Sequence, residues 1–403
     1  MGVMEKTGVH VIVVGAGLGG LTAALALLKQ DFRVTVLEQS PTLGEVGAGV
    51  QLSANATRVL SLLGVDNVVT DSGVEVTGKE IRLWSTGQTW KLFDLGATSR
   101  EQYGHPYCTF HRADLHKALE HGVRSLDPSA IRLGARCVSV DISGKRPTVV
   151  LENGERIEGD LIVGADGVHS RVRQAIVGPD KPRYSGCRAW RGIIPVERLP
   201  EHLRKLVGVN WVGPGRHVVH YPLRRGELIN FVGIVEGGAW EAESWTLQGS
   251  MKECLEDFEG WHEDIHTMIR AIETHYKWAL MVREPISSWS VEGMTLLGDA
   301  AHPTLPFLSQ GAAMAIEDGY VLARALANQR TSLSQSLQSY EAARVERTAR
   351  VVHSSNENAT RFHNPKLADA IGAADYIGEQ WAPEKVRQRY EWLFEYKADE
   401  VPI

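Results

Sequence analysis

The feature that most constrains this chain is its start, where an apolar run meets three spaced glycines. Residues 9–14 read VHVIVV, which is typical of a strand buried on both faces of a sheet. Gly15, Gly17 and Gly20 follow, and the Ala- and Leu-rich residues 21–30 predict a helix. A second strand is predicted at 33–39. Together these elements form a β-α-β unit of the Rossmann type.

The G-x-G-x-x-G spacing has a physical purpose at each position. Gly15 allows a tight turn, Gly17 lets the backbone approach a pyrophosphate, and Gly20 lets the helix pack closely on the strand. The helix N-terminus then presents free N–H groups to the phosphates. Glu38 lies 18 residues past Gly20, where a ribose-binding acid is expected. The pattern predicts a bound dinucleotide, and NAD and FAD both fit it.

A similar strand–loop–helix pattern returns late in the chain, at MTLLGDAAHPTLPFLSQGAAMAIEDG, residues 294–319. Between the two patterns, residues 183 to about 240 are mostly strand-like, and six of the 11 tryptophans fall between 190 and 278. A sheet with aromatic side chains on one face could form the wall of a site for a flat apolar ligand. We therefore predict a nucleotide-binding domain from residues 1–75, 105–182 and 290–355. Residues 76–104 and 183–289 would form a β-rich substrate domain, and 356–403 a C-terminal helical segment.

Composition excludes several classes of protein. The net charge is −6 with the basic residues spread along the chain, so no nucleic-acid partner is expected. The four cysteines are far apart and no pair has C-x-x-C spacing, which argues against a disulfide framework or a metal site. There is no signal-peptide pattern and no run of about 20 apolar residues, so no membrane span and a cytoplasmic location are expected. A homodimer is left open.

Three motifs in order carry a family resemblance. They are the glycine fingerprint, GADGVHSRVR at 164–173 and LLGDAAHPTLPFLSQGAAMAIED at 296–318. Together they resemble the single-component FAD-dependent aromatic hydroxylases, which include p-hydroxybenzoate hydroxylase and salicylate hydroxylase. The likeness covers residues 9 to about 350 and favours FAD over NAD. It implies an α/β fold, in which a Rossmann-like FAD-binding domain carries an inserted β-rich substrate domain and C-terminal helices.

The resemblance also implies roles for single residues around the cofactor. Asp299 would accept hydrogen bonds from ribityl hydroxyls of FAD, and Pro306 would sit in a stiff loop beside the isoalloxazine. Backbone N–H groups of Gly311, Ala312 and Ala313, at a helix start, would face the N1–C2=O edge of the flavin. A helix N-terminus at that edge stabilises the negative charge of reduced flavin.

Two further residues, Arg112 and Asp166, have two readings each. Arg112 matches the family arginine that contacts FAD, but a helix-start ion pair would also explain it. Asp166 belongs to the motif linked to FAD and nicotinamide handling, or it caps a helix that begins near Ser170. His302 is read as structural, and Gln310 stands where related enzymes vary.

The segment RHVVHYPLRRGE at 216–227 is the best candidate for substrate chemistry. On a strand, His217, Val219 and Tyr221 share one face and His220 points the other way. The segment resembles its equivalent in 3-hydroxybenzoate 6-hydroxylase and 6-hydroxynicotinate 3-monooxygenase. That resemblance implies His217 as a base or hydrogen-bond partner for a phenol and Tyr221 as a substrate contact, although a packing role for His217 stays open. Arg191 could bind a substrate carboxylate or form a surface ion pair.

The expected activity follows from the resemblance. An FAD-dependent monooxygenase would use NAD(P)H and O2 to hydroxylate a hydroxylated aromatic acid. Salicylate is favoured, with loss of CO2 to give catechol, and 3-hydroxybenzoate and 6-hydroxynicotinate are alternatives. The loop LPFLSQG differs from 3-hydroxybenzoate 6-hydroxylase-like proteins, which place a Gln earlier. Two other classes remain open: a nicotinamide dehydrogenase, which would leave the Asp299 motif unexplained, and a non-catalytic binding protein with this fold.

Overall fold

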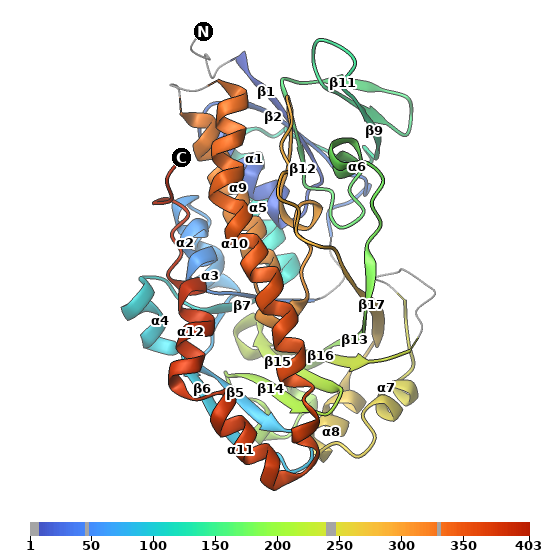
Figure 1. The fold of residues 1–403 in the computed structure, drawn as a ribbon, viewed down its shortest axis with the longest axis vertical. Helices are drawn as coiled ribbons and strands as arrows, with labels where there is room; N and C mark the ends of the chain where they lie inside the picture. Colours follow the sequence, from blue (N-terminus) through green and yellow to red (C-terminus); the bar gives the residue numbers. More distant parts are fainter. Residues whose placement is uncertain (1–7, 45–47, 239–246, 329–331) are drawn as a thin grey trace.

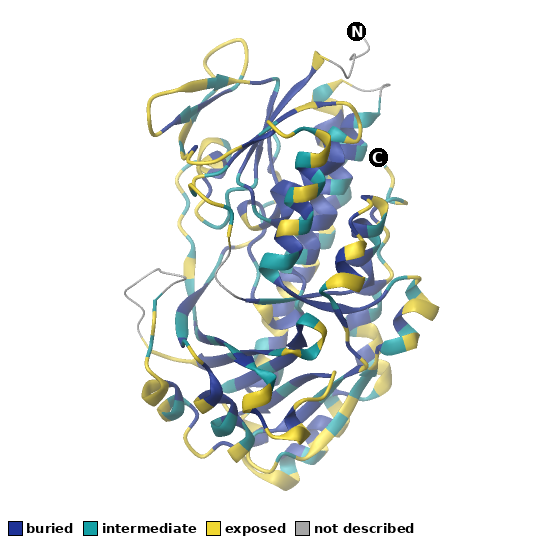
Figure 2. Cartoon of the chain, turned by 180° about the vertical axis from the view of Figure 1, so that it is seen from behind, coloured by how far each residue is buried: buried dark blue, intermediate teal, exposed yellow. Residues whose placement is uncertain are grey.

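A computed structural model describes residues 8–44, 48–238, 247–328 and 332–403. Two of the six tryptophans counted above, Trp240 and Trp245, lie outside these ranges. The molecule is elongated, with a parallel sheet toward one end, a larger sheet toward the other, and the long helix α10 (Leu333–Phe362) running between them (Figure 1). Buried residues fill the central helices and inner strands, and exposed residues mark the peripheral loops (Figure 2).

The first sheet has five parallel strands in the order β18-β12-β1-β2-β8. Their bounds are β1 (His10–Val14), β2 (Arg33–Leu37), β8 (Ile131–Arg132), β12 (Leu161–Gly164) and β18 (Met294–Leu296). Helices α1 (Leu18–Leu28), α5 (Arg112–Leu126) and α9 (Gly311–Ala327) share one hydrophobic core with this sheet. Gly319 lets α9 approach α1, because a Cβ there would lie 2.6 Å from the backbone nitrogen of Ala23. Strands far apart in sequence therefore build one nucleotide-type sheet.

The second sheet has seven strands in the order β17-β13-β16-β15-β14-β5-β6. Their bounds are β5 (Gly78–Leu83), β6 (Thr89–Asp94), β13 (Arg183–Pro195), β14 (Gly208–Gly213), β15 (Arg216–Leu223), β16 (Leu228–Glu236) and β17 (Tyr276–Val282). Alternation gives it two faces. Trp190, Trp211 and Phe231 belong to a buried cluster with α7 (Met251–Asp257) and α8 (Glu263–Ala271). Residues on the opposite face line a cavity.

The remaining elements connect and cover these sheets. Two small sheets consist of β3 (Gly49–Leu52), β7 (Cys108–His111) and β4 (Val74–Glu75), and of β11 (Arg156–Glu158), β10 (Thr148–Leu151) and β9 (Cys137–Asp141). The other helices are α2 (Ala54–Leu62), α3 (Asn67–Asp71), α4 (Gly96–Tyr103), α6 (Arg171–Val177), α11 (Ala370–Gln380) and α12 (Pro383–Phe394). The domain boundaries stay predictions, and the one at 355/356 falls inside α10. Within the described ranges, no helix combines the length and the apolarity that crossing a bilayer requires.

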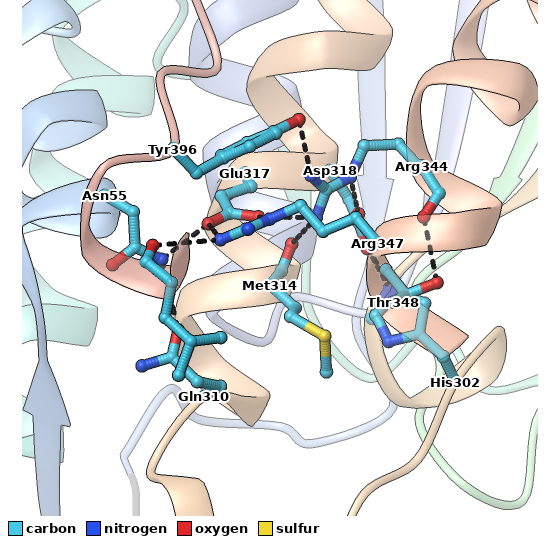
Figure 3. Close-up of polar contacts among 12 residues, drawn as sticks. Asn55, His302, Gln310, Met314, Glu317, Asp318, Arg344, Arg347, Thr348 and Tyr396 are labelled. Carbon is cyan, nitrogen blue, oxygen red and sulfur yellow. Dashed lines mark hydrogen bonds and ion pairs between the residues drawn. The ribbon is translucent and has the colours of Figure 1, made fainter. Parts of the chain in front are cut away.

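A buried ion network joins α9 to α10 (Figure 3). The Arg344 Nε lies 2.7 Å from Asp318 Oδ1, and its Nη2 lies 2.7 Å from Glu317 Oε2. All three side chains have zero exposure. Arg347 pairs with the other oxygen of Glu317 at 2.8 Å, and His302 Nε2 lies 2.6 Å from Asp318 Oδ2. His302 thus has a structural role at the start of the loop before α9.

The network predicts a large effect of Arg344→Met on stability. Removing the guanidinium takes one cationic partner from each of two buried carboxylates, and breaking a buried pair in this way costs roughly 3–5 kcal/mol. We expect a clearly lower urea midpoint, followed by tryptophan fluorescence. Arg350→Met on the same helix is the control, because Arg350 is exposed and only stacks over Trp392 at 3.8 Å. An equal shift in both variants would contradict this role of the network.

Candidate active site

A cavity of about 390 Å³ lies between the first sheet's loops and the inner face of the second sheet. Of the residues singled out from the sequence, ten line it: Gly17, Gly20, Arg112, Arg191, His217, Tyr221, Asp299, Pro306, Gly311 and Ala312. Gly15, Glu38, Asp166 and Ala313 are not among the lining residues. One cavity therefore unites the fingerprint, the late loop and the strand of His217.

The fingerprint glycines divide into two kinds. Gly15 has φ +104°, and a Cβ there would lie 2.4 Å from the Ala165 carbonyl oxygen. A Cβ on Gly20 would lie 2.0 Å from the Gly15 oxygen. Both positions therefore need glycine for the turn itself. A Cβ on Gly17 would meet nothing within 4 Å, so this glycine borders open space where phosphates would approach.

Two predicted cofactor residues make contacts within the protein instead of facing the cavity. Glu38 accepts hydrogen bonds from the backbone N–H of Ala16, at 3.0 Å, and of Ser40, at 2.8 Å. Asp166 accepts from the Arg171 N–H at 2.7 Å and from the Ser170 hydroxyl, which are the contacts of a helix cap. Their roles toward a cofactor stay predictions.

The late loop presents an acid and a helix start to the cavity. Asp299 keeps an exposed surface that opens on the cavity, and no described residue donates a hydrogen bond to its carboxylate. Desolvation of the carboxylate inside the cavity raises the pKa of Asp299, while the charges of His302 and Arg112 act to lower it. Helix α9 begins at Gly311, and the Gln310 side chain does not cap it. Gln310 is buried and donates to the Ser53 hydroxyl at 2.9 Å.

These groups fit a flavin dinucleotide. The Asp299 carboxylate needs hydroxyl donors, and the uncapped N-terminus of α9 offers N–H groups to an anion. Gly17 leaves room for a pyrophosphate beside α1. Ala312 lines the cavity with Gly311, whereas Ala313 is fully buried behind them, so any part it has toward the flavin is through its backbone.

At the other end of the cavity lie His217 and Tyr221, on the same face of β15. His220 points to the opposite face, where it accepts a hydrogen bond from Trp211 Nε1 at 3.2 Å. His217 Nδ1 lies 2.6 Å from His363 Nε2. Burial, and then the charge of His363, hold the pKa of His217 well below its usual value. His217 is therefore a neutral imidazole at physiological pH.

The walls around these two residues are aromatic and tightly packed. A Cβ on Gly49 would lie 2.7 Å from the Tyr221 hydroxyl oxygen, so β3 must carry glycine there. Burial raises the pKa of Tyr221, which keeps this hydroxyl protonated. The Arg191 guanidinium lies 5.1 Å above the Trp278 ring. Phe362 of α10 and Tyr390 of α12 also line the cavity, so the C-terminal segment closes it.

Sequence reasoning missed Lys79, the most informative residue of the cavity. Lys79 lines the cavity from β5, and its Nζ lies 4.7 Å above the Tyr107 ring. No described acid forms an ion pair with it. Burial lowers the pKa of Lys79 to about 7. The signal was a lone lysine followed on the same strand face by Ile81 and Leu83, in GKEIRL at 78–83.

Sequence reasoning also missed His363 and Glu236. Together with Cys187 they place potential metal-ligand atoms within 4.8 Å of one another. Both ring nitrogens of His363 are already engaged, one with His217 and one with Glu236 at 2.6 Å. A metal ion at His363 would have to displace one of these hydrogen bonds. All four cysteines of the chain are free.

A cavity that joins a dinucleotide turn to an aromatic-lined sheet is the arrangement of a flavoprotein oxidoreductase acting on a small ring. The sequence profile of the FAD binding domain family matches residues 8–355, and the chain belongs to this family. It is 37% identical over 388 residues to 3-hydroxybenzoate 6-hydroxylase 1 of Aquipseudomonas alcaligenes, with 96% of this chain and 97% of that protein covered.

Two further comparisons agree. The chain is 35% identical over 393 residues to 3-amino-4-hydroxybenzoate 2-monooxygenase PtnB3 of Streptomyces platensis, and the match covers 97% of each chain. The crystal structure of Klebsiella pneumoniae HpxO complexed with FAD and uric acid superposes with a TM-score of 0.82 at 25% identity, over 100% of both chains. The protein is an FAD-dependent aromatic monooxygenase, and NAD(P)H is its co-substrate.

The cavity predicts that Asp299→Ala weakens FAD binding. Charge-assisted hydrogen bonds contribute roughly 1.5–3 kcal/mol each, so the dissociation constant should rise about 10- to 100-fold. Titration of the apoprotein with FAD, followed by flavin fluorescence, measures it. Asp375→Ala, an exposed acid on α11, is the matched control. The same FAD affinity in Asp299→Ala and the native protein would refute the assigned contact.

Proposed function

We propose that this monooxygenase hydroxylates a hydroxybenzoate, with the carboxylate bound by Lys79 and the phenol directed to His217. The observation that carries the proposal is the cavity itself. It combines a cation that has no anionic partner among the described residues, a neutral imidazole and the flavin loop. A substrate with one acidic end, a flat ring and a phenol complements all three.

The desolvation of Lys79 supports an acidic substrate. An ammonium in a dry site loses hydration, and the lowered pKa measures that cost. A carboxylate beside Nζ restores the lost stabilisation, because opposite charges favour each other strongly where water is scarce. Only β14 lies between β5 and β15, and the register puts Lys79 level with Gly208 but His217 level with Val212. Their Cα atoms are therefore roughly 16 Å apart. Both residues line the cavity, so their side chains span part of this separation and a single ring with two polar ends can occupy the rest.

His217 supports a phenolic substrate. FAD, once reduced by NAD(P)H, activates O2 and supplies the oxygen atom that enters the ring. The ring carbon reacts more readily when the phenol loses its proton, and a neutral imidazole at the cavity wall can accept that proton. The Tyr221 hydroxyl stays protonated and can donate a hydrogen bond to the substrate.

Among the candidate aromatic acids, the sequence favoured salicylate, but the relatives of highest identity described above carry names of a 3-hydroxybenzoate and a 3-amino-4-hydroxybenzoate enzyme. We rank 3-hydroxybenzoate first, salicylate second and 6-hydroxynicotinate third. NADH and NADPH oxidation by the FAD-loaded protein, with product analysis for each acid, tests the ranking. The absence of substrate-stimulated oxidation with any acid of the panel would overturn the proposal.

Lys79→Met should lower kcat/KM for the acid about 10- to 100-fold, because one charge-assisted contact of roughly 1.5–3 kcal/mol is lost. Turnover of the matching carboxamide should change little. Because burial lowers the pKa of Lys79 to about 7, its cationic fraction falls as pH rises through that range. In the native enzyme kcat/KM for the acid should therefore fall as pH rises through about 7, and this limb should vanish in Lys79→Met. Equal losses for acid and amide would argue against carboxylate binding.

His217→Ala should impair hydroxylation more than flavin reduction. Loss of a positioned base slows the proton-transfer step by about 10²- to 10⁴-fold in typical enzymes, whereas hydride transfer to the flavin does not need it. The yield of hydroxylated product per NAD(P)H and the rate of flavin reduction measure the two steps. His353→Ala, an exposed histidine of α10, is the control. Equal losses in both steps would count against a base role.

A further inference from the structure

Three hydrogen-bonded side chains lead from the cavity to the protein surface. His217 Nδ1 lies 2.6 Å from His363 Nε2, and His363 Nδ1 lies 2.6 Å from Glu236 Oε1. His217 lines the cavity and is only 1% exposed, whereas the Glu236 side chain is 48% exposed. Two hydrogen bonds thus connect a dry site to solvent.

The backbone holds these three residues in place. They come from β15, from the C-terminal end of α10 and from the end of β16. The Gly215 N–H donates to the His363 carbonyl oxygen at 3.1 Å, and the Glu236 N–H donates to the Gly215 carbonyl oxygen at 2.9 Å. One turn therefore ties His363 and Glu236 to the strand of His217.

The hydrogen bonds limit which ring nitrogens can carry protons. An ionised carboxylate only accepts, so His363 Nδ1 must donate to Glu236. The hydrogen bond from His363 lowers the pKa of Glu236, so this acid is ionised. When His363 accepts at Nε2, His217 donates from Nδ1. The Nε2 atom of His217 is left with a lone pair for a proton from the cavity.

His217 cannot store such a proton. Phe307 and Phe362 lie 5.0 and 5.1 Å from its ring and exclude water. An imidazolium there has lost its hydration, which is why burial depresses the pKa of His217. A base in this position is effective only if the proton moves on. His363 and Glu236 provide the path.

We propose that His217, His363 and Glu236 form a relay that carries the phenol proton of the bound substrate to solvent. This inference rests on the proposed function. The phenol O–H bond breaks and its proton joins His217 Nε2. The Nδ1 proton of His217 moves to His363 Nε2, and the Nδ1 proton of His363 moves to Glu236, which releases it to water. Transfer in reverse, to the product oxygen, restores both ring tautomers, so no co-reactant is consumed.

His363 and Glu236 are positioning and relay residues that act through His217. The test uses FAD-loaded enzyme without NAD(P)H and 3-hydroxy-4-nitrobenzoate, whose phenolate absorbs visible light. Mixing occurs below the phenol pKa of the probe, and a pH-indicator dye follows proton release. We expect Glu236→Gln and His363→Gln to slow phenolate formation and proton release at least tenfold, with the probe dissociation constant within twofold of native. Formate should restore the rate in Glu236→Ala.

The controls separate the relay from general damage and from the proposed function. Glu284→Gln, an exposed acid elsewhere, should behave as native. Failure of the native enzyme to bind or ionise the probe would overturn the proposed function and the relay with it. Native ionisation together with native rates in all the Glu236 and His363 variants would overturn the relay alone. Slow proton release in His363→Gln together with native proton release in the Glu236 variants would also overturn the relay, because the proton would then not leave through Glu236.

Discussion

The ion network around Arg344 is the constraint on which the active site depends. Glu317 and Asp318, in the middle of α9, form ion pairs with Arg344 of α10, and none of the three side chains is exposed to solvent. The second oxygen of Asp318 accepts from the Gly298 N–H at 2.9 Å, one residue before Asp299. Buried charges tolerate little displacement, because each lost contact exposes another charge to a low dielectric. The network therefore fixes the loop and the helix start that face the flavin.

The same principle explains how α2 joins the site. The Asn55 amide donates to Glu317 at 2.5 Å and to Gln310 at 3.1 Å, so the residue before α9 is held from two sides (Figure 3). Gln310 thereby turns its side chain away from the cavity and leaves the N-terminus of α9 to its backbone N–H groups. A site built on helices with a supporting polar layer keeps a precise geometry.

Local patterns in the sequence predicted the parts of the fold that local physics decides. The helix expected after the glycine fingerprint forms as α1 (Leu18–Leu28), and alternation placed His217 and His220 on opposite faces of β15. Tertiary contacts could not be predicted in this way. Nothing near His363 indicates that the end of α10 meets β15. The motif around Asp166 also could not separate a helix cap from a cofactor contact, because one carboxylate suits both.

Lys79 and His217 show how one physical perturbation serves two purposes. Burial lowers the proton affinity of both groups. In the proposed site, Lys79 regains its charge when a carboxylate binds, so desolvation becomes selectivity for an acid. Among the described residues His217 contacts no such anion, and in the proposed relay its proton passes to His363 and Glu236 instead. The cavity thus keeps positive charge at the end that holds the substrate and removes it from the end where the phenolate must form. A substrate carrying two negative charges can then be bound without a trapped imidazolium neutralising the ring that has to react.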